Sequence, residues 1–401
     1  MKNKFLFLGI AAALFIACES DDTSDIVIND NSVTNNTTNN TTGGGGEEIT
    51  TVNLSGVYTV DLTLDPDIEY IITGPVLIAN GATFTVPAGM TIKAEPVGVN
   101  AYIAIQQGAR IVADGTAINP IVFTSKASAP SAGNWGGLVL CGRAPINSTA
   151  DGSTDTATTE VGGLSYGGNT PDDDSGIVRY VRIEYAGGAI DGNAELNSLS
   201  VYAVGTGTVI DYVEAYEGSD DGFEFFGGTV NASHLVVVNA EDDSIDWTEG
   251  FNGSVTDAYI QHGASHDKAF ECDGYNTDFS NEGGYYSNPT ITNVTIVGDG
   301  IDDDDEAVRL RAGTQGTFTN IVINDYDEAF DLDGDAGDNP TGQGVVDDVL
   351  NIIDVTFNNI TTPLKNDTGF VFDETDIFTG VGNGTGTDFA TWAAGWTVGI
   401  N

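Results

Sequence analysis

The sequence predicts an all-β fold, a β-solenoid whose coils each contain a little over twenty residues. Fifty-two glycines, abundant Val, Ile and Thr, and the lack of a long helical periodicity favour many short strands joined by turns. A phrase that begins with aspartate recurs along the second half of the chain. Within each copy, apolar and polar residues alternate, which is the pattern of a strand.

The recurrent phrase sets the length of one coil. Its copies read DDGFEFFGG, DDSIDWTEG, DKAFECDGY, DEAVRLRAG and DEAFDLDGD, and they begin at Asp220, Asp242, Asp267, Asp305 and Asp327. These starts are 22, 25, 38 and 22 positions apart. A period in the low twenties, with longer steps taken up by loop insertions, is typical of a β-solenoid.

The alternation inside the phrase predicts which side chains point into the solenoid. The fourth and sixth positions are apolar in every copy, if cysteine is counted as apolar. These pairs are Phe223 and Phe225, Ile245 and Trp247, Phe270 and Cys272, Val308 and Leu310, Phe330 and Leu332. Since neighbouring side chains of a strand point to opposite faces, we expect both positions to face inward.

A second strand is expected at an equal distance after three of the copies. Its apolar pairs are Val236 and Val238, Ala258 and Ile260, Ile321 and Ile323. The amides that follow them directly are Asn239, Gln261 and Asn324. These amides could form a hydrogen-bonded ladder from coil to coil, although isolated turn residues explain them nearly as well.

The outward fifth position of the phrase predicts a ladder of charges. Its occupants are Glu224, Asp246, Glu271, Arg309 and Asp331. Neighbouring coils lie about 4.8 Å apart, so these side chains should interact. We expect Arg309 and Arg311 to pair with Glu271 or Asp273 on one side and with Asp331 or Asp333 on the other.

Three segments resemble a known class of proteins. FTVPAGMTIKA, GARIVADGTAINPIVFTS and GNWGGLVLCG resemble the opening coils of right-handed parallel β-helix lipoproteins of the pectate-lyase-like class. The resemblance implies a right-handed parallel β-helix and runs from about Leu54 to the mid-200s. It does not imply one activity, because such coils carry enzymes, adhesins and other proteins.

The N-terminus has the features of a lipoprotein signal peptide. Lys2 and Lys4 precede an apolar stretch, Phe5 to Ala17, that is too short to span a bilayer. The end of this stretch, LFIAC, resembles a bacterial lipobox, which implies cleavage before Cys18 and acylation of its thiol. The following ESDDTSD resembles the acidic tract that directs Bacteroidota-type lipoproteins to the cell surface.

Three parts are therefore expected. Residues 1–17 form the signal peptide, residues 18–51 the acylated cysteine and a flexible Asn/Thr/Gly-rich tether, and residues 52–401 the β-helix domain. We expect the mature protein to be exposed at the cell surface and held in the outer membrane by its lipid.

Charge narrows the classes of partner. The formal net charge is −48, from 60 Asp and Glu against 12 Lys and Arg, which disfavours nucleic acids and anionic membrane surfaces. So many carboxylates favour calcium as a cofactor. The candidate ligands lie in two acidic loops, Asp331, Asp333, Asp335 and Asp338 in one, Asp302 and Asp304 in the other. Neither matches an EF-hand, and a solvated acidic loop is the alternative reading of each.

Catalysis is a further alternative. A polysaccharide lyase needs a cation beside a uronate carboxylate and a nearby base, for which the candidates are Lys268, Arg309, Arg311 and Asp243. A glycosidase needs two carboxylates, nominally supplied by the doublets at Asp220 and Asp242. Acids recur at this corner in every coil, so such a pair is not distinctive.

The remaining polar and aromatic residues have simpler readings. The histidines are His234, His262 and His266. We expect the pair His262 and His266, four positions apart, to be surface turn residues rather than metal ligands, because it lies in a strand-to-turn segment and not on a helix. Trp392 and Trp396 are expected to cap the last coil, with a platform for stacking sugars as the alternative.

Together these observations predict a calcium-binding surface lipoprotein. It would act as a binding module or as an accessory subunit of an outer-membrane complex with a β-barrel protein, and a surface glycan is another candidate partner. A calcium-dependent lyase or glycosidase and an adhesin are the alternatives.

The lipoprotein prediction has a direct test. Changing Cys18→Ala should leave the precursor unprocessed or misplaced, because the thiol that accepts the lipid is gone. Membrane fractionation and mass spectrometry of the N-terminus measure this outcome. Normal processing and membrane association of the variant would contradict the prediction.

Overall fold

The computed structural model describes residues 50–147, 155–191, 194–276, 285–301, 305–334 and 341–400. All of them belong to the unit Val33–Asn401, and Cys18 lies outside the described residues. One sheet joins 22 strands of this part of the chain, and its neighbouring strands pair in parallel. The predicted all-β parallel β-helix is thus confirmed. Within these residues, no helix has the length and apolar character needed to cross a membrane.

Most strands of the large sheet have ten residues or fewer, and β24 and β25 have 17 each. They are β1 Thr51–Tyr58, β2 Leu62–Thr63, β3 Glu69–Ile78, β4 Thr83–Val86, β5 Thr91–Ala94, β6 Ile103–Ile105, β7 Arg110–Asp114, β8 Ile121–Ser125, β9 Leu138–Cys141, β12 Gly176–Glu184, β15 Leu199–Tyr202, β16 Val209–Tyr216, β17 Phe223–Phe226, β18 Asn231–Val238, β19 Ile245–Thr248, β20 Ser254–Gln261, β21 Phe270–Asp273, β22 Thr290–Val297, β23 Glu306–Arg311, β24 Gly316–Leu332, β25 Leu350–Asn366 and β26 Phe378–Thr379. Two antiparallel pairs project from it, β10 Ala157–Thr158 with β11 Ser165–Tyr166, and β13 Ala189–Asp191 with β14 Ala194–Glu195. The helices are α1 Thr341–Val346, α2 Glu374–Ile377 and α3 Phe389–Trp392.

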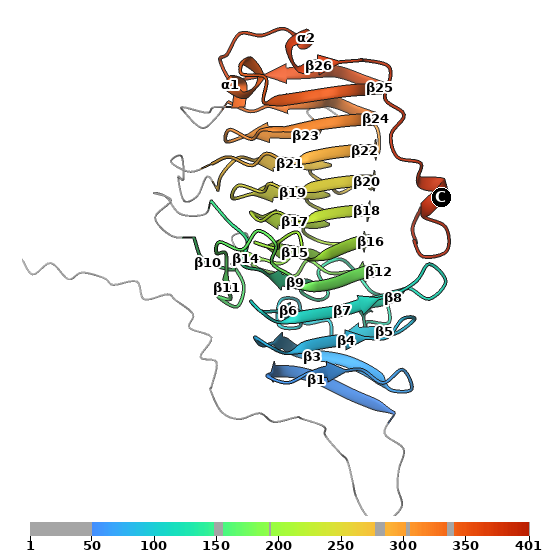
Figure 1. Ribbon diagram of the computed structural model, residues 1–401. Helices are drawn as coiled ribbons and strands as arrows, with labels where there is room; N and C mark the ends of the chain where they lie inside the picture. The colour runs from blue at the N-terminus through green and yellow to red at the C-terminus, as the bar shows by residue number, and fades with distance from the viewer. Residues whose placement is uncertain are drawn as a thin grey trace, which may run out of the picture. The chain divides into compact units, whose positions relative to one another are not determined.

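Strands of successive coils lie on one another along the helix axis (Figure 1). On one side, which we call the ladder face, β9, β15, β17, β19, β21 and β23 pair in that order. The other two faces share longer strands, among them β16, β18, β20 and β22. Each coil is therefore a triangle with strands on its three sides.

A single residue makes the bend in each of these longer strands. Tyr212, His234, Asp257 and Asn293 are left out of the pairing, and their φ angles are 55°, 51°, 60° and 57°. Asn and Asp tolerate this left-handed region best among residues with a side chain. Tyr212 and His234 gain a stacking contact there, with ring centroids 4.0 Å apart. We call this row of residues the bend column.

The core confirms the alternation read from the repeat. The fourth-position residues are at most 1% exposed, and Trp247, at a sixth position, is fully buried. Aromatic rings meet between coils, for example Trp247 with Phe270 at 5.9 Å and Phe225 with Phe251 at 4.6 Å between centroids. The interior is thus filled by the side chains of every second residue of each strand, as the alternation predicted.

The predicted register of the second strand is wrong in one coil. Leu235 and Val237, not Val236 and Val238, pair with Ala258 and Ile260 and face the core. The reason is that 23 residues separate these paired positions, whereas the repeat has a step of 22 at this point. Val236 and Val238 lie on the outer side, where Trp396 covers them.

The hydrogen-bonded amides form mainly at another corner. Asn239 donates to Glu217 at 2.9 Å, and of the expected amides only Asn324 meets another, accepting from Asn358 at 2.9 Å. A second ladder runs along the bend column. Its side-chain bonds are Asn320 Nδ2 to Asn293 Oδ1 at 2.8 Å and Asn293 Nδ2 to Asp257 Oδ1 at 3.2 Å. The bend residues can form these side-chain hydrogen bonds because they share the same left-handed backbone conformation. Their side chains therefore line up along the helix axis.

The C-terminal segment does not cap the last coil, which corrects the expectation for Trp392 and Trp396. After β26 the chain turns back along the side of the helix, to the level of β18 and β20 (Figure 1). We call residues 383–400 the strap. Trp396 is fully buried and meets Tyr180 and Tyr212 edge-on, at 5.8 and 5.9 Å between centroids. The outward-facing aromatic rings of Tyr180 and Tyr212 supply the apolar contact that holds the strap there.

The strap should contribute strongly to stability. Changing Trp396→Ala removes a fully buried indole and uncovers Val236 and Val238, so we expect a loss of about 3–5 kcal/mol in the free energy of unfolding. Denaturant unfolding measures it. The matched control is Val371→Ala, at a side chain that is 96% exposed and should matter little. Equal effects of the two changes would show that the strap does not stabilise the fold.

Candidate functional site

The ladder face brings the predicted column of charges into register. Glu224 pairs with Asp246, Asp246 with Glu271, Glu271 with Arg309, and Arg309 with Asp331 along successive strands. Ser200 precedes this column and Lys365 follows it. Three carboxylates therefore stand in sequence before the first basic residue.

Basic side chains neutralise the far end of this column. Arg311 donates to Glu271 and Asp273, each at 2.5 Å, and Arg309 donates to Glu306 through two bonds of 2.9 Å. The expected pairing with Glu271 is confirmed, for Arg309 at 3.9 Å and for Arg311 at 2.5 Å, whereas Asp331 forms an ion pair with neither arginine. Because Arg309 turns toward Glu306 of its own strand, Asp331 pairs instead with Lys365 of the next coil, at 3.4 Å.

A second column of carboxylates lies at the corner before the ladder face. Asp221 accepts a hydrogen bond from the backbone N–H of Asp243 at 3.0 Å, and Asp243 accepts one from the backbone N–H of Lys268 at 2.6 Å. Both aspartates are at most 5% exposed. They hold the corners of consecutive coils together, so Asp243 has a structural role that the catalytic reading did not foresee.

The two columns meet in a compact group, Asp221, Glu224 and Asp246, which we call the carboxylate cluster. One oxygen from each lies within 4.8 Å of the others. None of the described Lys or Arg side chains forms an ion pair with these three residues. Burial first, and then repulsion from neighbouring carboxylates, raises the pKa of each of the three well above its usual range.

Unsatisfied oxygens point to what this cluster lacks. Asn197 is 2% exposed, and its Nδ2 donates to Glu224 at 2.6 Å, yet its Oδ1 has no hydrogen-bond partner in the described structure. Asp246 Oδ1 is likewise buried without a partner among these residues. Buried acceptors without donors are costly. An all-oxygen set of carboxylates and an amide suits a hard cation such as calcium.

Most predicted ligands of the two calcium loops lie outside the described residues. These are Asp335, Asp338, Asp302 and Asp304. Asp331 is buried against Lys365, and its pKa rises to about 7 because burial and Glu306 outweigh that lysine. The cluster that sequence reasoning missed includes Asn197, which comes from a coil without the aspartate phrase. The only sequence signal for Asn197 as a member of the cluster was its position two coils before Asp246.

The residues of the lyase alternative are already engaged. Lys268 is 5% exposed and pairs with Asp267 and Glu271. Burial alone would lower the pKa of Lys268, but Asp243 and Asp267 together raise it above its ordinary value. A lysine that holds its proton more tightly is a poor general base.

His262 is not the surface turn residue that was expected. His262 is 4% exposed, and its ring nitrogens meet Ser244 Oγ at 2.9 Å and Tyr326 Oη at 2.7 Å. Burial and then the neighbouring His266 lower the pKa of His262 to about 3. His262 is therefore a neutral residue of the core.

Comparison with known proteins gives one clear match. A family model described as a pectate-lyase like beta helix domain matches residues 56–397. No curated protein matches the sequence.

Solved structures show only distant similarity. The catalytic unit of the thermostable GH87 alpha-1,3-glucanase from Streptomyces thermodiastaticus strain HF3-3 is 11% identical, with a TM-score of 0.34. That alignment covers 82% of this chain and 64% of the glucanase chain, which is less than two thirds of it. The Family 28 exopolygalacturonase of Yersinia enterocolitica is 12% identical over 77% of this chain and 74% of its own, with a TM-score of 0.17. Such values carry no argument about activity.

The ion pairs of Arg311 should be structural. Changing Arg311→Met leaves the carboxylates of Glu271 and Asp273, 13% and 8% exposed, without their main counter-charge, so we expect a loss of about 3 kcal/mol in the free energy of unfolding. The control is Lys126→Met, whose exposed pair with Glu95 should contribute little. Chemical denaturation measures both. A catalytic arginine would show the opposite result, lost activity on a glycan with stability unchanged.

Proposed function

The chain belongs to the pectate-lyase-like β-helix family, and from this premise we propose that it is a calcium-binding module of a surface lipoprotein. The observation that supports calcium most is the carboxylate cluster with its unpartnered oxygens. The proposal therefore places the cation at Asp221, Glu224 and Asp246, with Asn197 beside them, rather than in the two acidic loops alone.

The coils that follow the carboxylate cluster show how the chain neutralises stacked carboxylates. At Glu271 and Asp273 the counter-charge is Arg311, and at Glu328 and Asp331 it is Lys365. At the cluster, the described residues supply no such side chain. A divalent cation would do there what a guanidinium or ammonium group does elsewhere on the same face.

The attachment to the outer membrane is supported by the sequence of the N-terminus. A leader that ends in LFIA before Cys18, an acidic tract and an Asn/Thr/Gly-rich tether would display the β-helix at the cell surface. There the acidic ladder face could bind a surface glycan through calcium, or the module could serve as an accessory subunit of a β-barrel complex. Stoichiometric co-purification with a β-barrel protein after gentle detergent extraction would identify the second role, and its absence together with cell adhesion would favour an adhesin.

One observation favours an enzyme as the second candidate. Burial, followed by Glu195 and Asp242, raises the pKa of Asp220 to about 8, so this carboxyl group keeps a proton at neutral pH. A protonated acid beside other carboxylates is the equipment of a glycosidase. Release of reducing sugar from a glycan, lost on changing Asp220→Asn, would move the assignment to this candidate.

Calcium should stabilise the protein, and more so at higher pH. In chelator, the folded carboxylates hold protons that the unfolded chain releases. We therefore expect the free energy of unfolding to fall as the pH rises above about 4 toward the raised pKa values of Asp221, Glu224 and Asp246. Calcium displaces those protons, so its affinity should rise over the same range. At a hundred times its dissociation constant it would add about 2.7 kcal/mol.

Thermal unfolding in millimolar calcium and in chelator measures this stabilisation. Changing Asp246→Asn should remove most of it, because the central ligand of the cluster loses its charge. Asp114→Asn, at an exposed carboxylate of β7, is the control and should keep it. If calcium shifts the wild type and Asp246→Asn alike, the cluster is not the site.

A further inference from the structure

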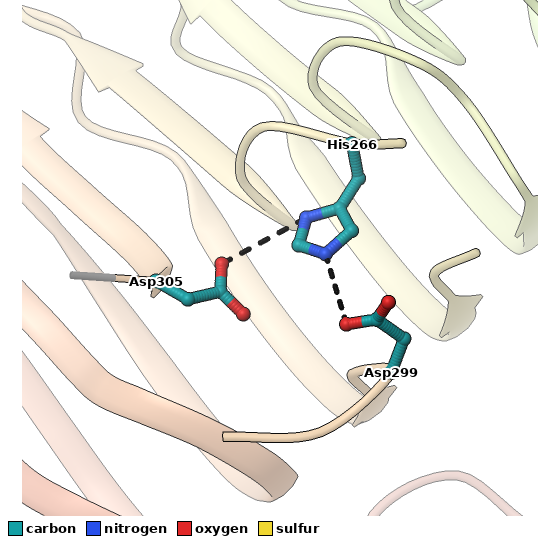
Figure 2. Close-up of side chains that lie close together, drawn as sticks. All are labelled: His266, Asp299 and Asp305. Atoms are coloured by element: carbon teal, nitrogen blue, oxygen red, sulfur yellow. Dashed lines mark hydrogen bonds and ion pairs between the residues drawn. The ribbon is translucent and has the colours of Figure 1, made fainter. Parts of the chain in front are cut away.

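A second set of metal-ligating side chains gathers away from the carboxylate cluster. His266 lies between β20 and β21, Asp299 follows β22, and Asp305 directly precedes β23. Figure 2 shows the imidazole between the two carboxylates. Three separate segments of neighbouring coils thus contribute one side chain each to one place.

The two carboxylates approach different nitrogens of the His266 ring. Nε2 is 3.3 Å from Asp299 Oδ1, and Nδ1 is 3.8 Å from Asp305 Oδ1, so only the first distance joins two ligand atoms of an ion bound at Nε2. One ligand atom from each residue lies within 4.8 Å of the other two. Two ligand atoms that are each about 2.0–2.2 Å from one ion are at most about 4.4 Å apart, which is close to these separations. The side chains of His266, Asp299 and Asp305 are 10%, 27% and 11% exposed, so the group is enclosed but open on the Asp299 side.

The hydrogen bonds of His266 supply an independent argument. Its Nδ1 lies 2.9 Å from the backbone carbonyl oxygen of Asp267, which can only accept, so Nδ1 carries a proton. In the neutral ring, Nε2 then presents its lone pair to the Asp299 carboxylate. Two acceptors face each other there, and this arrangement is stable only with a proton or a metal ion between them. A histidine that donates through one nitrogen to a carbonyl and binds through the other is the common arrangement at metal sites.

The surroundings fix the orientation of the ring. His262 packs against His266 with ring centroids 4.2 Å apart, and both nitrogens of His262 are held by Ser244 and Tyr326. His262 therefore supports the ring and does not compete as a ligand. Within the described structure, Asp299 forms its ion pair with His266 and none with Lys or Arg.

We propose that His266, Asp299 and Asp305 bind a first-row divalent transition metal such as zinc or cobalt(II). One imidazole nitrogen and two carboxylates give a formal charge of −2, which matches a divalent ion. The nitrogen ligand favours these metals over calcium. Three protein ligands leave positions for water or for an oxygen ligand from outside. The site is thus chemically distinct from the all-oxygen carboxylate cluster.

Cobalt(II) provides the direct test, because its visible absorption reports nitrogen and oxygen ligands. Untagged, chelator-treated protein is titrated with cobalt(II) and, by calorimetry, with zinc, in the presence of millimolar calcium. We expect one ion per chain at this site, and a loss of affinity of at least about tenfold on changing His266→Ala or Asp299→Asn.

Two controls keep the result specific. His234→Ala removes a histidine that pairs with Asp211 elsewhere, so it should bind cobalt as the wild type does. Asp246→Asn should also bind it normally, which separates this site from the calcium proposal. If His266→Ala retains full affinity, or if the wild type binds neither metal at millimolar concentration, the ring is only an imidazolium between two carboxylates and the proposal is wrong.

Discussion

The fixed spacing of the coils is the constraint on which the rest of this structure depends. Parallel pairing in register places every outward side chain about 4.8 Å from its equivalents above and below. A repeated residue type therefore becomes a column of contacts, favourable for aromatic rings and amides, unfavourable for charges. The bend column shows the first case, and the ladder face shows the second.

On the ladder face, the repulsion between stacked carboxylates is reduced in several ways. Asp221 and Asp243 cap backbone N–H groups of the next coil, which gives each carboxylate a donor. Arg311 and Lys365 neutralise others directly. What remains must be met by protons or by bound cations, and both follow from the same electrostatics, since a carboxylate that keeps its proton at neutral pH is one that a divalent ion can bind by displacing it.

Much of the fold was predictable because period two and a recurring aspartate are local signals. They identified the inward residues Phe223, Ile245 and Trp247 correctly. The register of Leu235 was not predictable in this way, because one extra residue in the connection between β19 and β20 leaves no mark on composition. The carboxylate cluster was missed for a related reason. Asn197 and Glu224 meet only because of coil stacking, and their burial depends on packing that no single coil encodes.

The strap changes how such a solenoid should come apart. A stack of coils that touch only their neighbours can open from either end, one coil at a time. Here Asn383 bonds to Asp354 near the last coil, while Val398 donates to the buried Glu214 several coils away. The final coils therefore cannot peel away without also releasing contacts in the middle of the molecule. A nearly one-dimensional architecture thereby gains long-range cooperativity, and fraying at its C-terminal end is coupled to the unfolding of its centre.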